Sequence, residues 1–250
     1  MLLKLADRKL IEISGRDKES FLQGLITNDI MKIKEQGIIF SAFLSAQGKF
    51  LADFFIFQHN DNLIIDINEI FIENFIAKLQ LYKLNSIVNI KKIEATIFID
   101  ENLNNNYLNS YLDPRKLDSW QRVYDFNIKI TNYNSDKIVD YHKLRFKHKL
   151  IDGAFDLIID KSYILEFAYN EINAISFSKG CYVGQEVTAR TYHRGIIRKE
   201  IIFVKASKLE QSIIEENKLF IDGKKVGIIC HKSCDNYMVL IKKDYTNRFL

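Results

Sequence analysis

The sequence predicts an α+β protein in which a long mixed body is followed by a small region made of strands. Three observations support this class: short apolar strands separated by turns near the start, one amphipathic helix after them, and a series of short strands near the end. The chain has 250 residues, of which 47% are hydrophobic. It is therefore long enough to bury a full core, as one large domain or as two to three small ones.

The opening strands are predicted from short apolar runs that are bounded by turn residues. Asp17 is a suitable N-cap for a short helix whose apolar residues share one face. Asp53 interrupts an otherwise apolar strand, and strand alternation favours a side chain that faces solvent. Turns at 47–49 and 59–62 join three of the strands into an antiparallel meander. The strands expected in this part are 9–13, 40–44, 50–57 and 63–67.

The meander is followed by the best amphipathic helix of the chain, residues 69–84, whose apolar residues recur at helical spacing. We expect this helix to pack on the preceding sheet. Strands at 87–91 and 96–100 then complete a split β-α-β arrangement of the ferredoxin-like kind. Residues 101–110 are rich in asparagine and have no apolar period, which predicts a loop. A further helix is expected from an N-cap at Ser135 through His148.

The last quarter of the chain changes to short strands. The sequence Asp222-Gly223-Lys224 predicts a tight hairpin turn between two of them. A series of short strands after a long α+β body predicts a separate small β-barrel. The expected strands are 196–204, 218–221, 226–230 and 237–241.

Composition limits the class of protein. The 36 basic and 32 acidic residues leave a formal charge of +4, which permits an anionic ligand but does not indicate a nucleic-acid binder. The longest apolar runs are too short to span a membrane, and the first residues lack the character of a leader or a transit peptide. Three cysteines without a secretory leader indicate a reducing compartment. We therefore expect a cytoplasmic protein.

The most informative stretch is 175–199, ISFSKGCYVGQEVTARTYHRGIIRK. We expect a short strand, a turn and then a helix that starts at Tyr182 and is closed by Gly195 in a left-handed conformation. Cys181 would then lie at a helix N-terminus with Lys179 near it, and both effects favour a thiolate. The alternative is a small buried cysteine, and the residues alone leave both interpretations open.

The same helix carries charged residues at regular spacing. Glu186 and Arg190 are four residues apart with the acid first, the favourable order for a helical ion pair. The basic residues near the end of the helix can steer a carboxylate or phosphate tail, although a solvated helix end explains them nearly as well. A metal site at Cys230, His231 and Cys234 is disfavoured, because a structural zinc site takes two close pairs of ligands. We therefore expect no metal.

The segment KGCYVGQE followed by TARTYHRG resembles the signature of the YgfZ/GcvT-like folate-binding proteins, which include bacterial YgfZ and mitochondrial iron–sulfur assembly relatives. The segment ISGRDKESFLQGLITND resembles the opening of the same family. The resemblance implies two intertwined ferredoxin-like α+β units plus a C-terminal small β-barrel, as in the glycine cleavage T-protein. The implied domains are residues 1–45 with 126–195, residues 46–125, and a barrel of residues 196–250.

The resemblance also implies a function and a site. Its members bind tetrahydrofolate and support iron–sulfur cluster assembly or repair, with effects on clients that include tRNA-modifying enzymes. The implied partners are the assembly machinery or client proteins, and neither a membrane nor stable nucleic-acid binding is expected. Cys181 would perform a redox, sulfur-linked or one-carbon-linked step, and Lys179 would supply positive charge. The implied folate-binding residues are Asn28, Tyr182, Gln185, Glu186 and Arg194.

Two other functions stay open beside this one. The first is an aminomethyltransferase-type enzyme of folate-dependent one-carbon transfer, which shares the fold but carries a different segment where KGCYVGQE stands. The second is a non-catalytic RNA-associated module, which the mild net charge disfavours. The resemblance therefore describes either an accessory factor or a transferase.

Overall fold

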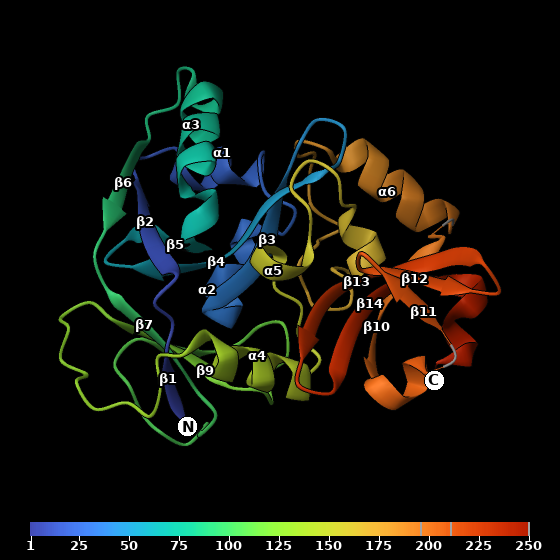
Figure 1. Ribbon diagram of the computed structural model, residues 1–250. Helices are drawn as coiled ribbons and strands as arrows, with labels where there is room; N and C mark the ends of the chain where they lie inside the picture. Colours follow the sequence, from blue (N-terminus) through green and yellow to red (C-terminus); the bar gives the residue numbers. More distant parts are fainter. Residues whose placement is uncertain (196, 211, 250) are drawn as a thin grey trace.

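The computed structural model describes residues 1–195, 197–210 and 212–249, and it confirms an α+β architecture built on three antiparallel sheets. In Figure 1 the first sheet and its helices lie to the upper left and the second sheet lies below them. The third sheet, in orange and red, lies to the right. None of the described helices is long and apolar enough to cross a membrane.

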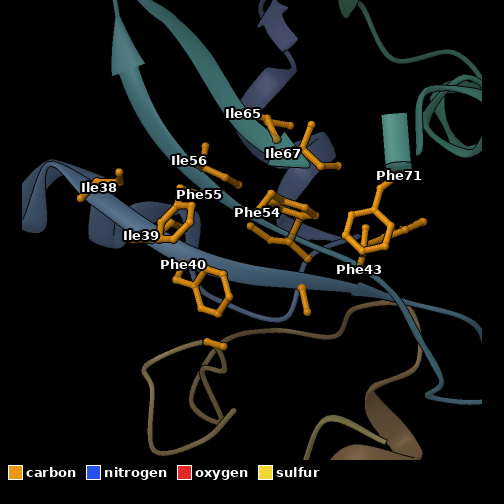
Figure 2. Close-up of a cluster of buried hydrophobic side chains, with 14 of the residues drawn as sticks. Ile38, Ile39, Phe40, Phe43, Phe54, Phe55, Ile56, Ile65, Ile67 and Phe71 are labelled. Carbon is orange, nitrogen blue, oxygen red and sulfur yellow. The ribbon is translucent and has the colours of Figure 1, made fainter. Parts of the chain in front are cut away.

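The first sheet contains the meander that the sequence predicts. Its strands are β2 Arg8–Ser14, β3 Ile38–Leu44, β4 Phe50–His59, β5 Asn62–Asn68 and β6 Asn89–Ile93. They are ordered β3-β4-β5-β2-β6, and every pair is antiparallel. All of β3 and most of β4 are buried, so both faces of this sheet are covered. Figure 2 shows its isoleucine and phenylalanine side chains packed together at the centre of the core.

Asp53 lies inside this covered sheet, so the expectation that it faces solvent is wrong. The residue is only 2% exposed. Its Oδ2 accepts hydrogen bonds from the main-chain N–H of Gly153 at 2.9 Å and from the hydroxyl of Tyr169 at 2.7 Å. Alternation predicts a solvent-facing side only where one face of a sheet is open, and neither face of β4 is open at this position.

Helices cover the first sheet. Their bounds are α1 Lys18–Gln23, α2 Ile33–Gln36 and α3 Ile72–Lys83, with 3₁₀ turns η1 Ile30–Lys32 and η2 Glu69–Phe71. The amphipathic helix expected at 69–84 is confirmed as η2 followed by α3. Its buried Phe75 ring lies edge-on to Phe43 of β3, with ring centroids 5.5 Å apart. β6 then pairs with β2 and completes the split β-α-β arrangement.

The strand expected at 96–100 forms, but its expected sheet is wrong. The second sheet contains β1 Leu2–Lys4, β7 Thr96–Asp100, β8 Ser110–Leu112 and β9 Gln121–Asp125, in the order β1-β7-β9-β8. β7 pairs with β1 and β9 and not with the meander. The physical reason is that β2 already pairs with β5 on one edge and with β6 on the other, so β7 cannot lie beside β2.

A buried ion network joins the first two sheets. Asp66 of β5 accepts a 2.7 Å hydrogen bond from Arg8 of β2 and a 2.5 Å hydrogen bond from Arg122 of β9. Burial opposes the ionisation of Asp66, but the two guanidinium groups hold its pKa below the usual value. Removing either arginine would leave the buried carboxylate of Asp66 with only one of its two guanidinium partners, which is destabilising.

The helices that follow the second sheet are α4 Ile138–Lys147, α5 Gly153–Asp156 and the 3₁₀ helix η3 Ile164–Phe167. α4 confirms the helix expected from an N-cap at Ser135 through His148, although its N-cap is Lys137, two residues later. The loop expected at 101–110 is also confirmed, since no regular element forms before β8 begins at residue 110.

The third sheet is open, so the expected closed barrel is not confirmed. Its elements are β10 Lys199–Lys205, β11 Ile213–Glu215, β12 Lys218–Ile221, β13 Lys224–Ser233 and β14 Asn236–Lys242, with 3₁₀ turns η4 Ala206–Leu209 and η5 Lys243–Arg248. The order is β10-β14-β13-β12-β11, and the described residues of the edge strands β10 and β11 do not pair with each other. Position 196, the first residue of the expected strand 196–204, lies outside the described residues.

Packing on both faces explains why this sheet stays open. Met238 and Leu240 of β14 pack into the main core, whereas Val239 and Ile241 pack into a second cluster with Phe249. Alternate residues of one strand therefore enter two different cores, and the sheet forms a layer between them. The division into two ferredoxin-like units and the three predicted domain boundaries stay predictions.

Candidate functional site

The signature segment forms a loop that leads into helix α6, Gln185–Arg194. Gly195 closes the helix with a φ of 68°, as the sequence predicts. The start is different, because the helix begins three residues after Tyr182. Gly184 is its N-cap and adopts a left-handed φ of 82°, which breaks the helical path before that point. Cys181 therefore lies in the loop before the helix and not in its first turn.

Lys179 anchors this loop to the first part of the chain. Its ammonium donates hydrogen bonds to the main-chain carbonyls of Gln23 at 2.6 Å, Ile26 at 2.7 Å and Asn28 at 2.9 Å. The residue is only 8% exposed, and burial lowers the pKa of its ammonium to about 8. Since all three protons of the ammonium are used, Lys179 holds together the segment after α1 and the signature loop.

The other side of Cys181 is anchored as well. Tyr182 is buried, with its ring 5.1 Å from the Lys179 ammonium, and the N–H of Val183 donates to the carbonyl of Gly24 at 3.2 Å. A Cβ atom on Gly184 would lie 2.5 Å from the carbonyl oxygen of Ser45, so only glycine allows this approach to the turn between β3 and β4. Cys181 itself is exposed. The structure thus presents its thiol to solvent on a loop held at both ends.

The remaining cysteines differ in their surroundings. Cys230 of β13 is partly buried, and burial raises the pKa of its thiol to about 12. Cys234, in the turn that follows, is exposed. No cluster of three or more potential metal ligands occurs among the described residues.

Asn28 is buried next to Lys179, and both the nitrogen and the oxygen of its side-chain amide form hydrogen bonds. Its amide donates to the carbonyls of Phe40 at 2.8 Å and Asn173 at 2.7 Å. Its Oδ1 accepts from the N–H of Asp29 at 2.9 Å and from Lys32 at 3.2 Å. These contacts give Asn28 a structural role, and a contact with a ligand stays a prediction.

The three predicted residues on α6 occupy different places. Gln185 is half-buried in the first turn, and Glu186 beside it is exposed and lies 3.7 Å from Arg190, which confirms the helical ion pair. Arg194 is exposed in the last turn, roughly 13 Å along the helix axis from Gln185. The structure therefore brings Lys179, Tyr182 and Asn28 together but keeps Arg194 apart from them.

A cavity of about 290 Å³ lies beside α6, on the face of the helix that carries Val187, Thr188 and Thr191. We call it the α6 pocket. Val187, Thr188 and Thr191 of α6 form one wall, and they share a face because they are three and four residues apart. None of the predicted site residues lines it. The lining residues are Gly48, Tyr163, Ile164, Leu165, Glu166, Val187, Thr188, Thr191, Ile197 and Arg198.

The α6 pocket combines apolar walls with a few polar groups, as sites for small ligands usually do. Glu166 contributes a carboxylate and pairs with Lys199 at 3.4 Å. Thr188 and Thr191 contribute hydroxyl groups, and Arg198 contributes a guanidinium. The spacing of the two threonines in TART, within the signature, was the one signal in the sequence that pointed to this wall.

Comparisons with known proteins agree with this architecture. Profiles of known protein families give no match. The mitochondrial iron–sulfur cluster assembly factor IBA57 homologue of Neurospora crassa is 30% identical over 230 residues, which cover 80% of this chain and 52% of that protein. The homologue of Mycosarcoma maydis is 27% identical and that of Dictyostelium discoideum 26%, covering 80% and 87% of this chain and 56% and 67% of those proteins. The chain thus spans about half the length of the first two relatives.

A solved structure shows the fold. The glycine cleavage system aminomethyltransferase T of Bartonella henselae superposes with a TM-score of 0.75, over 98% of this chain and 78% of that one, at 12% sequence identity. The architecture is therefore that of the aminomethyltransferase T class of α+β proteins. With the signature loop and the relatives taken together, the chain belongs to the YgfZ/GcvT-like family.

The expectation of a cytoplasmic location is wrong. The relatives from Neurospora crassa, Mycosarcoma maydis and Dictyostelium discoideum are named as mitochondrial proteins. The expectation depended on the character of the first residues and on the cysteine count. The cysteine count indicates a reducing environment but does not distinguish one reducing compartment from another.

Proposed function

We propose that the chain is an iron–sulfur cluster assembly or repair factor that binds tetrahydrofolate and acts through the thiol of Cys181. The observation that carries this proposal is an exposed cysteine on a loop held by the buried Lys179 ammonium, directly before a helix that also forms the wall of a pocket. The names of the relatives support the role in iron–sulfur assembly.

Cys181 is the reacting group of this proposal. Thiolates are the form of cysteine that binds iron and exchanges sulfur, and an exposed position gives a partner or a cluster direct access. Lys179 acts as a positioning residue, since its three protons are already donated to carbonyls. Its part is to hold the loop so that the thiol stays at the surface.

The α6 pocket is the proposed folate site. Its volume of about 290 Å³ is near the lower end of the usual range for small-ligand sites, roughly 300–1,000 Å³, and suits a bicyclic head group. Glu166 can accept hydrogen bonds from ring N–H groups, and the hydroxyl of Thr191 can donate or accept. The hydroxyl of Thr188 donates to the carbonyl of Gly184 at 3.4 Å and can accept. The apolar residues of the pocket would cover the faces of the ring. The folate, when bound, would supply one-carbon chemistry.

Complementation tests the role of the thiol. In a strain that lacks the protein, Cys181→Ala is expected to abolish rescue of enzymes that carry [4Fe–4S] clusters, including tRNA-modifying ones. The matched control is Cys234→Ala, which removes another exposed thiol and is expected to rescue fully. Full rescue by Cys181→Ala at normal protein levels would reject a chemical role for this cysteine.

Calorimetric titration with tetrahydrofolate tests the pocket. Saturable binding is expected for the wild-type chain, and Thr191→Trp should weaken it strongly because the indole would fill the pocket. His193→Trp places the same ring on an exposed position of the helix and should leave binding unchanged. Normal binding by Thr191→Trp would place the folate elsewhere, and no binding by the wild type would remove folate from the proposal.

The aminomethyltransferase alternative is supported by the fold alone. It predicts release of ammonia and formation of methylene-tetrahydrofolate from an aminomethyl-lipoyl carrier protein. We expect no such turnover, and steady release of ammonia would favour the alternative.

A further inference from the structure

Four large apolar side chains are exposed together where helix α3 ends. Leu81 is 74% exposed, Leu84 85%, Ile87 50% and Tyr82 40%. They lie in the last turn of α3 and in the connection to β6, which projects at the top of the view in Figure 1. Single exposed apolar residues are common on protein surfaces, but a contiguous group of them indicates an interaction site. We call these four residues the α3 tip.

The backbone at Leu84 adopts a conformation that a leucine rarely takes. Its φ is 43° and its ψ is −117°, and the N–H of Ser86 donates to the carbonyl of Lys83 at 2.8 Å. These angles match the first central position of a type II′ turn, where glycine is favoured. Since most of the Leu84 side chain is exposed, its packing does not offset this strain. Folding by itself therefore gives no reason for a leucine at this position.

The α3 tip is held in a fixed place. The ring of Tyr82 lies edge-on to Phe43 of β3, with ring centroids 6.1 Å apart. The N–H of Ile87 donates to Oδ2 of Asp17 at 2.7 Å, and the N–H of Asp17 donates to the carbonyl of Ile87 at 3.4 Å. Both ends of the tip are thus fastened to the body of the protein, so its apolar side chains are presented to the outside without further ordering.

Positive charge surrounds the α3 tip. The segment 78–92, KLQLYKLNSIVNIKK, contains four lysines and neither aspartate nor glutamate. Lys92 pairs with Glu73 at 2.5 Å, but among the described residues no carboxylate lies within ion-pair distance of Lys78, Lys83 or Lys91. Lys83 lies within the tip, and Lys78 is roughly 8 Å further down the helix axis, which is about one Debye length at physiological salt. The tip therefore combines apolar side chains with positive charge that the protein does not neutralise.

We infer that the α3 tip rests on an anionic phospholipid bilayer. Leu84 and its apolar neighbours lie among the headgroups, and the lysines lie beside lipid phosphates. Apolar residues next to a basic segment are the pattern of proteins that bind a membrane surface peripherally. A tyrosine suits the boundary between an apolar and a wet layer. The contact is reversible and needs no helix that crosses the bilayer.

A protein partner fits this surface less well. A stable protein–protein interface takes roughly 20–30 residues from each side, whereas the α3 tip supplies four apolar ones. A bilayer accommodates a small projection and offers negative charge all around it. The inference departs from the expectation, implied by the family resemblance, that no membrane is involved. It depends neither on the proposed folate binding nor on Cys181.

Vesicle flotation tests the inference. The full chain is mixed with vesicles of phosphatidylcholine alone or with roughly 30% phosphatidylserine added, and it should float only with the anionic vesicles. Leu84→Gly should weaken this binding by roughly tenfold, because it removes one apolar side chain from the lipid. The same change fits the type II′ turn, so the midpoint of thermal unfolding should stay the same or rise. A structural role for Leu84 would move the two measurements together.

Two further variants separate the apolar and the electrostatic parts of the contact. Leu81→Gln keeps a good helix former in the last turn of α3 and should also weaken binding by roughly tenfold. Lys83→Gln should weaken binding by roughly fivefold, and added salt should remove that difference. The matched controls are Leu108→Gly, at a leucine that is 91% exposed in the loop before β8, and Lys34→Gln on α2. Both should bind as the wild type does.

The other outcomes overturn the inference. These are absence of binding to anionic vesicles, equal binding to neutral vesicles, and unchanged binding by Leu84→Gly. Self-association of the wild-type chain that Leu84→Gly abolishes, without vesicle binding, would assign the α3 tip to a second copy of the protein. None of these results would affect the proposed role of Cys181, because Cys181→Ala is expected to bind vesicles as the wild type does.

Discussion

The ammonium of Lys179 donates a 2.9 Å hydrogen bond to the main-chain carbonyl of Asn28, a residue 151 positions earlier in the chain. Two further carbonyls from the same region share this ammonium. These contacts explain how a loop from the second half of the chain is held against the end of α1 and the residues that follow it. They also show that the lysine of the signature acts on backbone groups, whereas the neighbouring thiol of Cys181 is exposed to solvent.

Replacing Lys179 by methionine should destabilise the protein by roughly 2–4 kcal/mol. The methionine keeps most of the volume but leaves three carbonyls without their charged donor. The free energy of unfolding in urea measures the effect. The exposed Lys34 of α2 gives the control, and Lys34→Met should change stability by less than about 0.5 kcal/mol. Equal stability of the two variants would contradict the assigned role.

Replacing Gly184 by alanine should be much more costly than replacing Gly195 by alanine. Both residues have left-handed backbones, with φ of 82° and 68°, so each substitution costs about 1–2 kcal/mol of conformational energy. At Gly184 the new Cβ also meets backbone, 2.5 Å from the carbonyl oxygen of Ser45. At Gly195 no non-neighbouring atom of the described residues lies within 4 Å of the added Cβ. Thermal unfolding of both variants measures the difference, and similar losses would show that the contact with Ser45 is unimportant.

The stability of the protein should depend on pH through Asp53. Burial and the nearby Asp152 raise the pKa of Asp53 to about 6, from an ordinary value of 3.8. The folded state therefore holds this proton more tightly than the unfolded state. Its stabilising effect is complete below about pH 4 and is lost as the pH rises through 6.

The variant Asp53→Asn removes this titration. It should gain stability relative to the wild type as the pH rises from 4 to 6, by up to about 3 kcal/mol for a shift of this size. Urea unfolding at pH 4, 5, 6 and 7 measures the trend, with the exposed Asp118→Asn as control. A difference from the wild type that stays constant across this range would show that Asp53 does not titrate there.

The three cysteines should react with a maleimide at different rates at pH 7. Cys181 and Cys234 are exposed and should be labelled first. Cys230 should react much more slowly, because a pKa of about 12 leaves roughly one thiolate in 10⁵ at this pH. Mass spectrometry of the labelled peptides gives the order. Fast labelling of Cys230 in the folded protein would mean that the third sheet opens readily.

Local sequence patterns determined the elements of this protein well. The meander, the helix at 69–84 and the closure of α6 at Gly195 follow from apolar period and turn chemistry, which act over a few residues. The Glu186–Arg190 pair follows from helical spacing in the same way. The signature segment by itself indicates the YgfZ/GcvT-like family, which the relatives confirm.

Only the tertiary structure decided how these elements are assembled. The place of β7 beside β1 and β9, the open third sheet and the burial of Asp53 all depend on pairings and coverings between distant segments. The α6 pocket and the three hydrogen bonds from the Lys179 ammonium to main-chain carbonyls depend on them as well. The physical reason is that a residue's own neighbours set its backbone preference, whereas the group it finally contacts is brought to it by the rest of the chain.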